Sequence, residues 1–308
     1  MKKSMLSGLV LVFVLSLSVF AGGIPIQKSL VPADAKWMVH FDMEKFRNSR
    51  LHDFLMEENF TRSFRKWNSR LNKELDMDVI RDMSSLTVFN AGHEERSIVG
   101  CFRGRFDNLS LLEKIRERTE VDEIKSGSHT LLHWDRREYA VFAEKDLILY
   151  SNDRWAIENA LKSLPAKGKD VSVVSEVAKD VPSDAMMFAF MKNPRNLLGI
   201  PSKSKFIDKI GTVLYYMSEN ADIVRSFLRV ETQSREDAEN IQDLFKGMMA
   251  MVRLQAGEEY EEIKYLEDIK FKITGNRMEI QMSAPADEIF KILRKRMKLA
   301  AFLPAENY

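Results

Sequence analysis

The chain has 308 residues, of which 45% are hydrophobic and 30% are charged. Its 47 basic side chains nearly balance its 46 acidic ones, so the formal net charge is only +1 and gives no electrostatic basis for binding nucleic acid. This composition is typical of a globular protein, and the length can hold two domains of common size.

The first 21 residues have the pattern of a secretory signal peptide. Lys2 and Lys3 precede an apolar run from Met5 to Leu17, and Val19-Phe20-Ala21 offers a cleavage site. Cleavage after Ala21 predicts an exported protein, periplasmic or extracellular, with no membrane span left; losing the two lysines takes its formal net charge to −1. An uncleaved anchor is the alternative, because the uncharged stretch from Ser4 to Ile26 is long enough to cross a bilayer.

Two similar phrases follow, "VPADAKWMVHFD" from Val31 and "VPSDAMMFAFMK" from Val181. Each begins with a turn, in which proline fixes φ and aspartate can bond to its own backbone. Each continues into an apolar run that we predict to be a strand, Trp37–Phe41 in the first phrase and Met186–Met191 in the second.

The correspondence extends along the chain. Strand patterns recur at 87–89 and 212–214, then at 98–102 and 223–227. Each pair leads to a predicted helix with a capping box, formed by Ser110 with Glu113 in the first half and by Ser234 with Asp237 in the second. A hairpin and a last helix close each half, the hairpins over 139–150 and 269–282 and the helices over 155–164 and 285–298.

This recurrence predicts an α+β fold made of two tandem, duplicated units, each an antiparallel sheet with helices on one face. The predicted boundaries are a signal peptide over 1–21, a first unit over 22–165, a linker over 166–180, a second unit over 181–303 and a tail over 304–308.

The "VPADA" opening, the strand after it and an aspartate-led helix resemble certain exported bacterial proteins of unknown function. The resemblance rests on residues 31–42 and 181–192 and on the layout of the elements. It implies repeated α+β units and brings no established active site. Lys192 occupies the position that corresponds to Asp42, which disfavours two equivalent sites.

His40 and Asp42 form the one candidate catalytic pair. Side chains alternate along a strand, so both would project from the same face. Such a pair can support general base catalysis if a nucleophile lies within hydrogen-bonding reach. No Gly-x-Ser-x-Gly elbow nominates a serine, and a strand-end histidine without a catalytic role is the alternative.

The sequence predicts neither a metal site nor a cofactor. "HTLLH" places His129 and His133 four residues apart, but in a region with a strand pattern, where these side chains would lie roughly 13 Å from each other. "HEER" at His93 lacks the second histidine of the zinc helix motif. Cys101, the only cysteine, is expected to be a buried small hydrophobe, with a reactive thiol as the alternative.

Many of the 17 methionines lie in the second half of the chain. Most are expected to fill the core, but flexible methionines can also line an apolar groove, and thioethers can bind Cu(I). The candidates for a groove are Met248, Met249 and Met251.

These observations together predict an exported, non-enzymatic binding or interaction protein of the cell envelope or exterior. Its partner would be an unknown protein or an apolar ligand. The alternative is an envelope hydrolase with a scattered site near His40 and Asp42.

Overall fold

The computed structural model of the chain describes residues 31–32, 34–57, 62–91, 97–135, 137–164, 178–194, 207–256 and 267–291. The predicted signal peptide, His93, most of the predicted linker and the predicted tail lie outside the described residues. Within the described part of the chain, no helix is long and apolar enough to cross a membrane.

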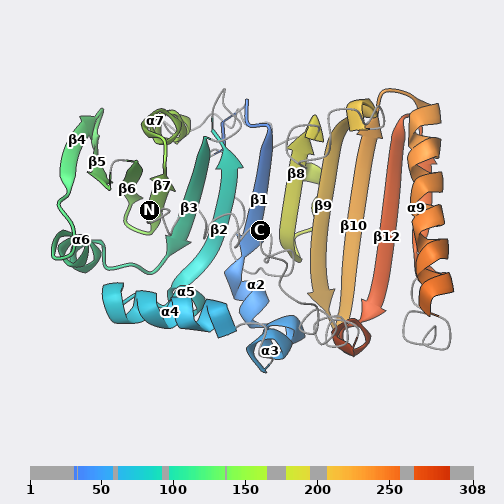
Figure 1. Ribbon diagram of the computed structural model, residues 1–308, viewed down its shortest axis with the longest axis horizontal. Helices are drawn as coiled ribbons and strands as arrows, with labels where there is room; N and C mark the ends of the chain where they lie inside the picture. Colours follow the sequence, from blue (N-terminus) through green and yellow to red (C-terminus); the bar gives the residue numbers. More distant parts are fainter. Residues whose placement is uncertain are drawn as a thin grey trace. The chain divides into compact units, whose positions relative to one another are not determined.

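The described elements divide into two compact units (Figure 1). The first unit contains β1 (Trp37–Asp42), α2 (Met43–Arg47), α4 (Arg62–Leu75), α5 (Val79–Asp82), β2 (Met83–Asn90), β3 (Ile98–Gly104), α6 (Asn108–Arg116), β4 (Asp122–Ser126), β5 (His129–Trp134), β6 (Glu138–Glu144), β7 (Leu147–Ser151), α7 (Arg154–Ser163), the 3₁₀ helix η3 (Ala178–Asp180) and β8 (Ala185–Lys192). The second contains α3 (Arg50–Glu57), the 3₁₀ helix η5 (Ile207–Lys209), β9 (Ile210–Asn220), β10 (Ile223–Thr232), α9 (Arg235–Ala256), β11 (Lys270–Thr274) and β12 (Arg277–Pro285).

The prediction of two tandem, duplicated units, each with its own sheet, is wrong. Over the described residues the strands form a single 12-stranded sheet in the order β11-β12-β10-β9-β8-β1-β2-β3-β7-β6-β5-β4. The first unit contributes the run from β8 to β4 and the second the run from β11 to β9, so the strands belong to one sheet and not to two separate ones.

The two similar phrases have a local explanation. In each, an alanine N–H donates to the carbonyl of the proline three residues earlier, Ala35 to Pro32 over 3.1 Å and Ala185 to Pro182 over 3.0 Å. The phrases therefore encode the same turn before a strand. The strands that follow, β1 and β8, pair antiparallel within the first unit, with Val39 opposite Ala189. The likeness thus includes the same turn chemistry, and the two strands that follow the turns are neighbours in the sheet.

Most individual elements lie where the sequence predicts them. The predicted strands correspond to β1, β8, β2, β3, β9 and β10, and the two predicted hairpins to β6–β7 and β11–β12. Gly275 turns the second hairpin at a φ of +60°, a conformation that glycine adopts without steric cost. The described part of the last predicted helix is helical over 286–291.

Aspartates begin most of the short helices of the first unit. The carboxylates of Asp42, Asp78, Asp107 and Asp153 accept backbone N–H groups in the first turns of α2, α5, α6 and α7. The predicted cap at Ser110 is wrong, because Asp107 caps α6 by accepting the Ser110 N–H over 3.1 Å. The predicted capping box of α9 is confirmed, since Ser234 Oγ accepts the Asp237 N–H over 3.1 Å.

Helix α9 packs in the second unit against β10, β11 and β12. Its buried residues Ala238 and Ile241 form a core cluster with Val230 of β10 and Met278 of β12. Phe245 also packs against this cluster, whereas Leu244 and Met248 of the same helix are exposed.

Candidate apolar ligand site

A cavity of about 440 Å³ lies over one face of the sheet in the first unit. Four strands that are neighbours in the sheet form its floor, and each contributes residues spaced two apart, which share a face because side chains alternate along a strand. These residues are Leu86 and Val88 of β2, Gly100 and Phe102 of β3, Ile148 and Tyr150 of β7, and Glu138, Ala140 and Phe142 of β6.

Helices and their connections supply the remaining walls. They contribute Leu71 and Leu75 from α4, Met77 from the connection to α5, Val79 from α5, and Leu111 and Ile115 from α6. Helix α4 contacts both α5 and α6. Nearly all of these side chains are aliphatic, and the volume lies within the range of roughly 300–1,000 Å³ that small-molecule pockets span.

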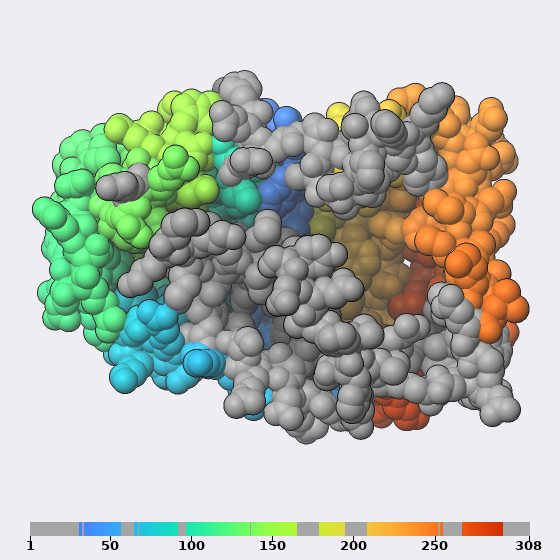
Figure 2. All heavy atoms as spheres, viewed as in Figure 1, coloured from blue at the N-terminus to red at the C-terminus, as the bar shows by residue number. Residues whose placement is uncertain are grey.

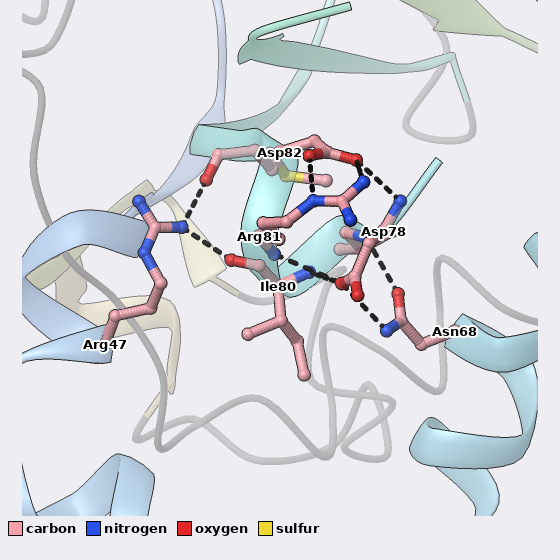
Figure 3. A network of polar contacts seen from close by, with 8 residues as sticks. Arg47, Asn68, Asp78, Ile80, Arg81 and Asp82 are labelled. Carbon is pink, nitrogen blue, oxygen red and sulfur yellow. Dashed lines mark hydrogen bonds and ion pairs between the residues drawn. The ribbon is translucent and has the colours of Figure 1, made fainter. Parts of the chain in front are cut away.

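A polar network fixes α4 to α5 at the edge of this cavity (Figure 3). Asn68 of α4 donates from Nδ2 to Asp78 Oδ1 over 3.0 Å, and its Oδ1 accepts the Val79 N–H over 2.8 Å. Asp78 Oδ1 also accepts the N–H groups of Ile80 and Arg81, which begin the helix. The Asn68 side chain therefore links α4 to the start of α5, and both helices line the cavity.

The other end of α5 is held by charged groups, also visible in Figure 3. Arg47 of α2 donates from one guanidinium nitrogen to the carbonyls of Ile80 and Met83, over 2.6 and 2.7 Å. Asp82 pairs with Arg81 over 2.7 Å and accepts the Asp78 N–H over 2.8 Å. Burial alone would raise the pKa of Asp82, but these hydrogen bonds lower it below its usual range, so the carboxylate stays ionised.

The few polar side chains of the cavity include Glu138, Tyr150, Asp135 and Arg118. Glu138 and Tyr150 are buried, with 7% and 8% of their surface exposed. Burial raises the pKa of the Tyr150 hydroxyl above its usual range, and the nearby Glu138 carboxylate raises it further. Tyr150 therefore remains a neutral phenol at any physiological pH.

His40 and Asp42 lie on β1, as predicted, but each has its own partner. His40 is buried, with Nδ1 2.8 Å from Thr87 Oγ1. Asp42 caps α2 and contacts Lys45 Nζ at 2.7 Å, and burial raises its pKa to about 6 despite this lysine. Lys45 Nζ also donates to the carbonyls of Ser183 and Ala185. The pair does not line the cavity.

The envelope hydrolase stays a prediction that one variant can test. A hydrolytic activity of the purified protein that disappears in Asp42→Asn, with an unchanged circular dichroism spectrum, would favour that hypothesis.

The methionine candidates lie on α9, whose surface is visible in orange in Figure 2. Met248 and Met251 are exposed, and Met249 is half-buried. Leu244 and Leu254 are also exposed and share one helical stripe with Met248 and Met251. None of the three methionines lines the cavity of the first unit, and a groove at these residues stays a prediction.

The remaining candidate residues are two histidines of the first unit, His129 and His133, and the cysteine Cys101. His129 and His133 both lie on strand β5, and the His133 ring stacks on Tyr139 at 4.6 Å between centroids. The described residues contain no group of three or more His, Cys, Asp or Glu side chains that could hold a metal ion. Cys101 of β3 is a free thiol with 2% of its surface exposed, and burial raises its pKa far above the usual range.

Sequence reasoning did not identify the cavity. Its residues come from two stretches of the chain, from Leu71 of α4 to Thr119 after α6 and from Trp134 of β5 to Tyr150 of β7, and no motif joins them. The available signal consisted of small residues, Gly100 and Ala140, at floor positions between bulky neighbours, and of a glutamate, Glu138, on the same strand face as Ala140.

No protein-family model and no curated protein matches the chain. Among solved structures, the chain is similar to TP0453 in crystal form III, with 9% identity and a TM-score of 0.49 over 87% of this chain and 97% of that one. Crystal form I of TP0453 gives 10% identity and a TM-score of 0.48 over 89% and 98%, and crystal form IV gives 10% and 0.47 over 86% and 95%.

Proposed function

We propose that this chain is an exported, non-enzymatic protein that binds an apolar small molecule in the cavity of its first unit. The observation that carries this proposal is a cavity of about 440 Å³ whose lining is mainly apolar and consists largely of buried and half-buried residues. Protein interiors are close-packed, and unfilled apolar volume costs stability. A cavity of this size is therefore best explained by an occupant.

The position of the cavity also supports binding. Leu86, Val88 and Met83 are each only 2% exposed, so a molecule that contacts these walls buries that part of its apolar surface. Burial of apolar surface contributes about 0.8 kcal/mol for each methylene. The affinity of a ligand with a hydrocarbon chain therefore increases with the length of the chain. Apolar contacts alone can hold such a ligand, without a reactive side chain in the cavity.

Titration with straight-chain alcohols from octan-1-ol to dodecan-1-ol tests the proposal, with the quenching or enhancement of tryptophan fluorescence as the signal. Trp134 lines the cavity and serves as the reporter. Each added methylene should tighten binding by about fourfold until the cavity is full. Absence of binding, or an affinity that is independent of chain length, would refute the proposal.

A variant with a narrowed cavity provides the control. Ala140→Leu adds three carbons at the floor and should weaken dodecan-1-ol binding by about tenfold to fiftyfold, since that volume is no longer open to the ligand. Ala160→Leu, in a buried position on α7 that does not line the cavity, should leave the affinity unchanged in the folded protein.

A further inference from the structure

The cavity has a polar element that a purely apolar ligand would leave unsatisfied. Glu138 and Tyr150 lie on the adjacent strands β6 and β7, and both side chains line the cavity. Tyr150 pairs in register with Ala140, two residues from Glu138, so the two polar side chains are diagonal neighbours on one sheet face. The Glu138 carboxylate is close enough to influence the Tyr150 hydroxyl.

The two side chains interact with each other, and the described part of the chain offers the Glu138 carboxylate no cation. No described lysine, arginine or histidine lies within 4.0 Å of the Glu138 carboxylate to pair with it. The Tyr150 hydroxyl, although buried, meets the geometry of a hydrogen bond with no atom of the described residues. Buried polar groups almost always have partners, and a buried charge without one is costly.

The other charges of the lining reinforce the need for a donor. Asp135 adds a second carboxylate near Tyr150. Arg118, the cation of the lining, is exposed and paired with Glu74 over 3.2 Å, so its charge is already balanced. The two carboxylates therefore offer acceptors, because a carboxylate has no proton to donate when ionised, and the Tyr150 hydroxyl can accept as well as donate.

We infer that the ligand of this cavity is a single-chain amphiphile whose polar end donates hydrogen bonds to Glu138 and Tyr150, an amine above all. Its hydrocarbon chain lies over the aliphatic floor, and its head group satisfies the two buried polar side chains. A ligand with a carboxylate head is disfavoured, since it would place a like charge beside Glu138. This inference rests on the proposed function and adds the class of head group to it.

Three probes of equal chain length test the inference on the purified full chain: dodecylamine, dodecan-1-ol and sodium dodecanoate, each below its critical micelle concentration at pH 7. Dodecylamine should bind more tightly than dodecanoate by about tenfold to a hundredfold, the size of a charge-assisted hydrogen bond, with the alcohol between them. Glu138→Gln should reduce the preference for the amine over the alcohol to within about threefold, because it removes the charge and keeps an acceptor.

Two further measurements keep the test decisive. The urea midpoint of ligand-free Glu138→Gln should not fall below that of the wild type, since the variant removes an unpaired buried charge. Tyr150→Phe keeps the ring and the carboxylate, and should therefore preserve the order of amine over carboxylate.

The outcomes separate the two proposals. If the alcohol binds but dodecanoate binds as tightly as the amine, or if Glu138→Gln leaves the amine preference intact, the inference about the head group is overturned and the apolar cavity still stands. Loss of the preference in Tyr150→Phe but not in Glu138→Gln overturns the role of Glu138. If none of the three probes binds, the proposed function itself is wrong.

Discussion

Replacing Ala140 by leucine tests whether the floor of the cavity faces open space. Ala140 is 6% exposed and lies on β6 between Leu132 of β5 and Tyr150 of β7. In a close-packed site, three added carbons would force neighbouring side chains apart and cost about 1–3 kcal/mol. Where the leucine enters existing apolar volume, it instead buries its own carbons, which stabilises the ligand-free protein by up to about 2 kcal/mol.

The matched control is the same substitution at Ala160. This residue on α7 has no exposed surface, and its helix contacts β3, β6 and β7. Ala160→Leu should overpack its surroundings and lower the free energy of unfolding by about 1–3 kcal/mol. The two Ala→Leu variants are therefore expected to change stability in opposite directions.

Urea unfolding at pH 7, followed by tryptophan fluorescence, measures both variants. The midpoint of Ala140→Leu should rise by on the order of 0.5–1 M, and that of Ala160→Leu should fall by a similar amount. If both midpoints fall together, the floor of the cavity is as tightly packed as the rest of the unit, and the reasoning from the cavity to a ligand fails.

Three more outcomes follow from single residues. Burial raises the pKa of Asp42 from its ordinary 3.8 to about 6 in the folded protein, so the folded state holds this proton more tightly than the unfolded chain does. The wild type should therefore lose about 1–3 kcal/mol of stability as the pH rises from about 4 to about 6, whereas Asp42→Asn should not; an equal change in pH dependence for the exposed Asp243→Asn would contradict this. The Cys101 thiol should react with a disulfide reagent only at the rate of unfolding, and fast labelling of the native protein would show that it is accessible. Asn68→Ala should lower the free energy of unfolding by about 1–2 kcal/mol in urea unfolding, because it removes both hydrogen bonds that join α4 to α5, while the exposed Asn72→Ala should change it little.

Local sequence patterns were sufficient to predict most of the strands. The hairpin β11–β12 combines alternating apolar residues with Gly275-Asn276 at the turn, and both signals act over a few residues. The Ser234–Asp237 capping box was equally readable, because its partners are three residues apart. The start of α6 was missed by three residues because Asp107 and Ser110 are both good caps, and the sequence alone does not decide between them.

The arrangement of the strands could not be predicted in this way. The turns at Pro32 and Pro182 are alike, and both lead into buried strands, so the sequence presents them as two copies. What the sequence does not show is which strands pair with each other. β1 lies between β2 and β8, so strand β8 completes the sheet of the first unit although it comes more than 140 residues after β1. That pairing depends on long-range contacts, which no local pattern records.

The cavity could not be predicted from sequence patterns for a related reason. Alternation of apolar residues shows which face of a strand is buried, but a face packed against helices and a face that borders empty volume have the same alternation. Gly100 and Ala140 on the floor read as ordinary strand residues until the helices that surround them are placed. Glu138 differs, because a carboxylate on a buried strand face has a cost that some partner must offset. Its position beside the apolar cavity is therefore the feature of the site that supports the proposed ligand with both a hydrocarbon chain and a hydrogen-bond donor.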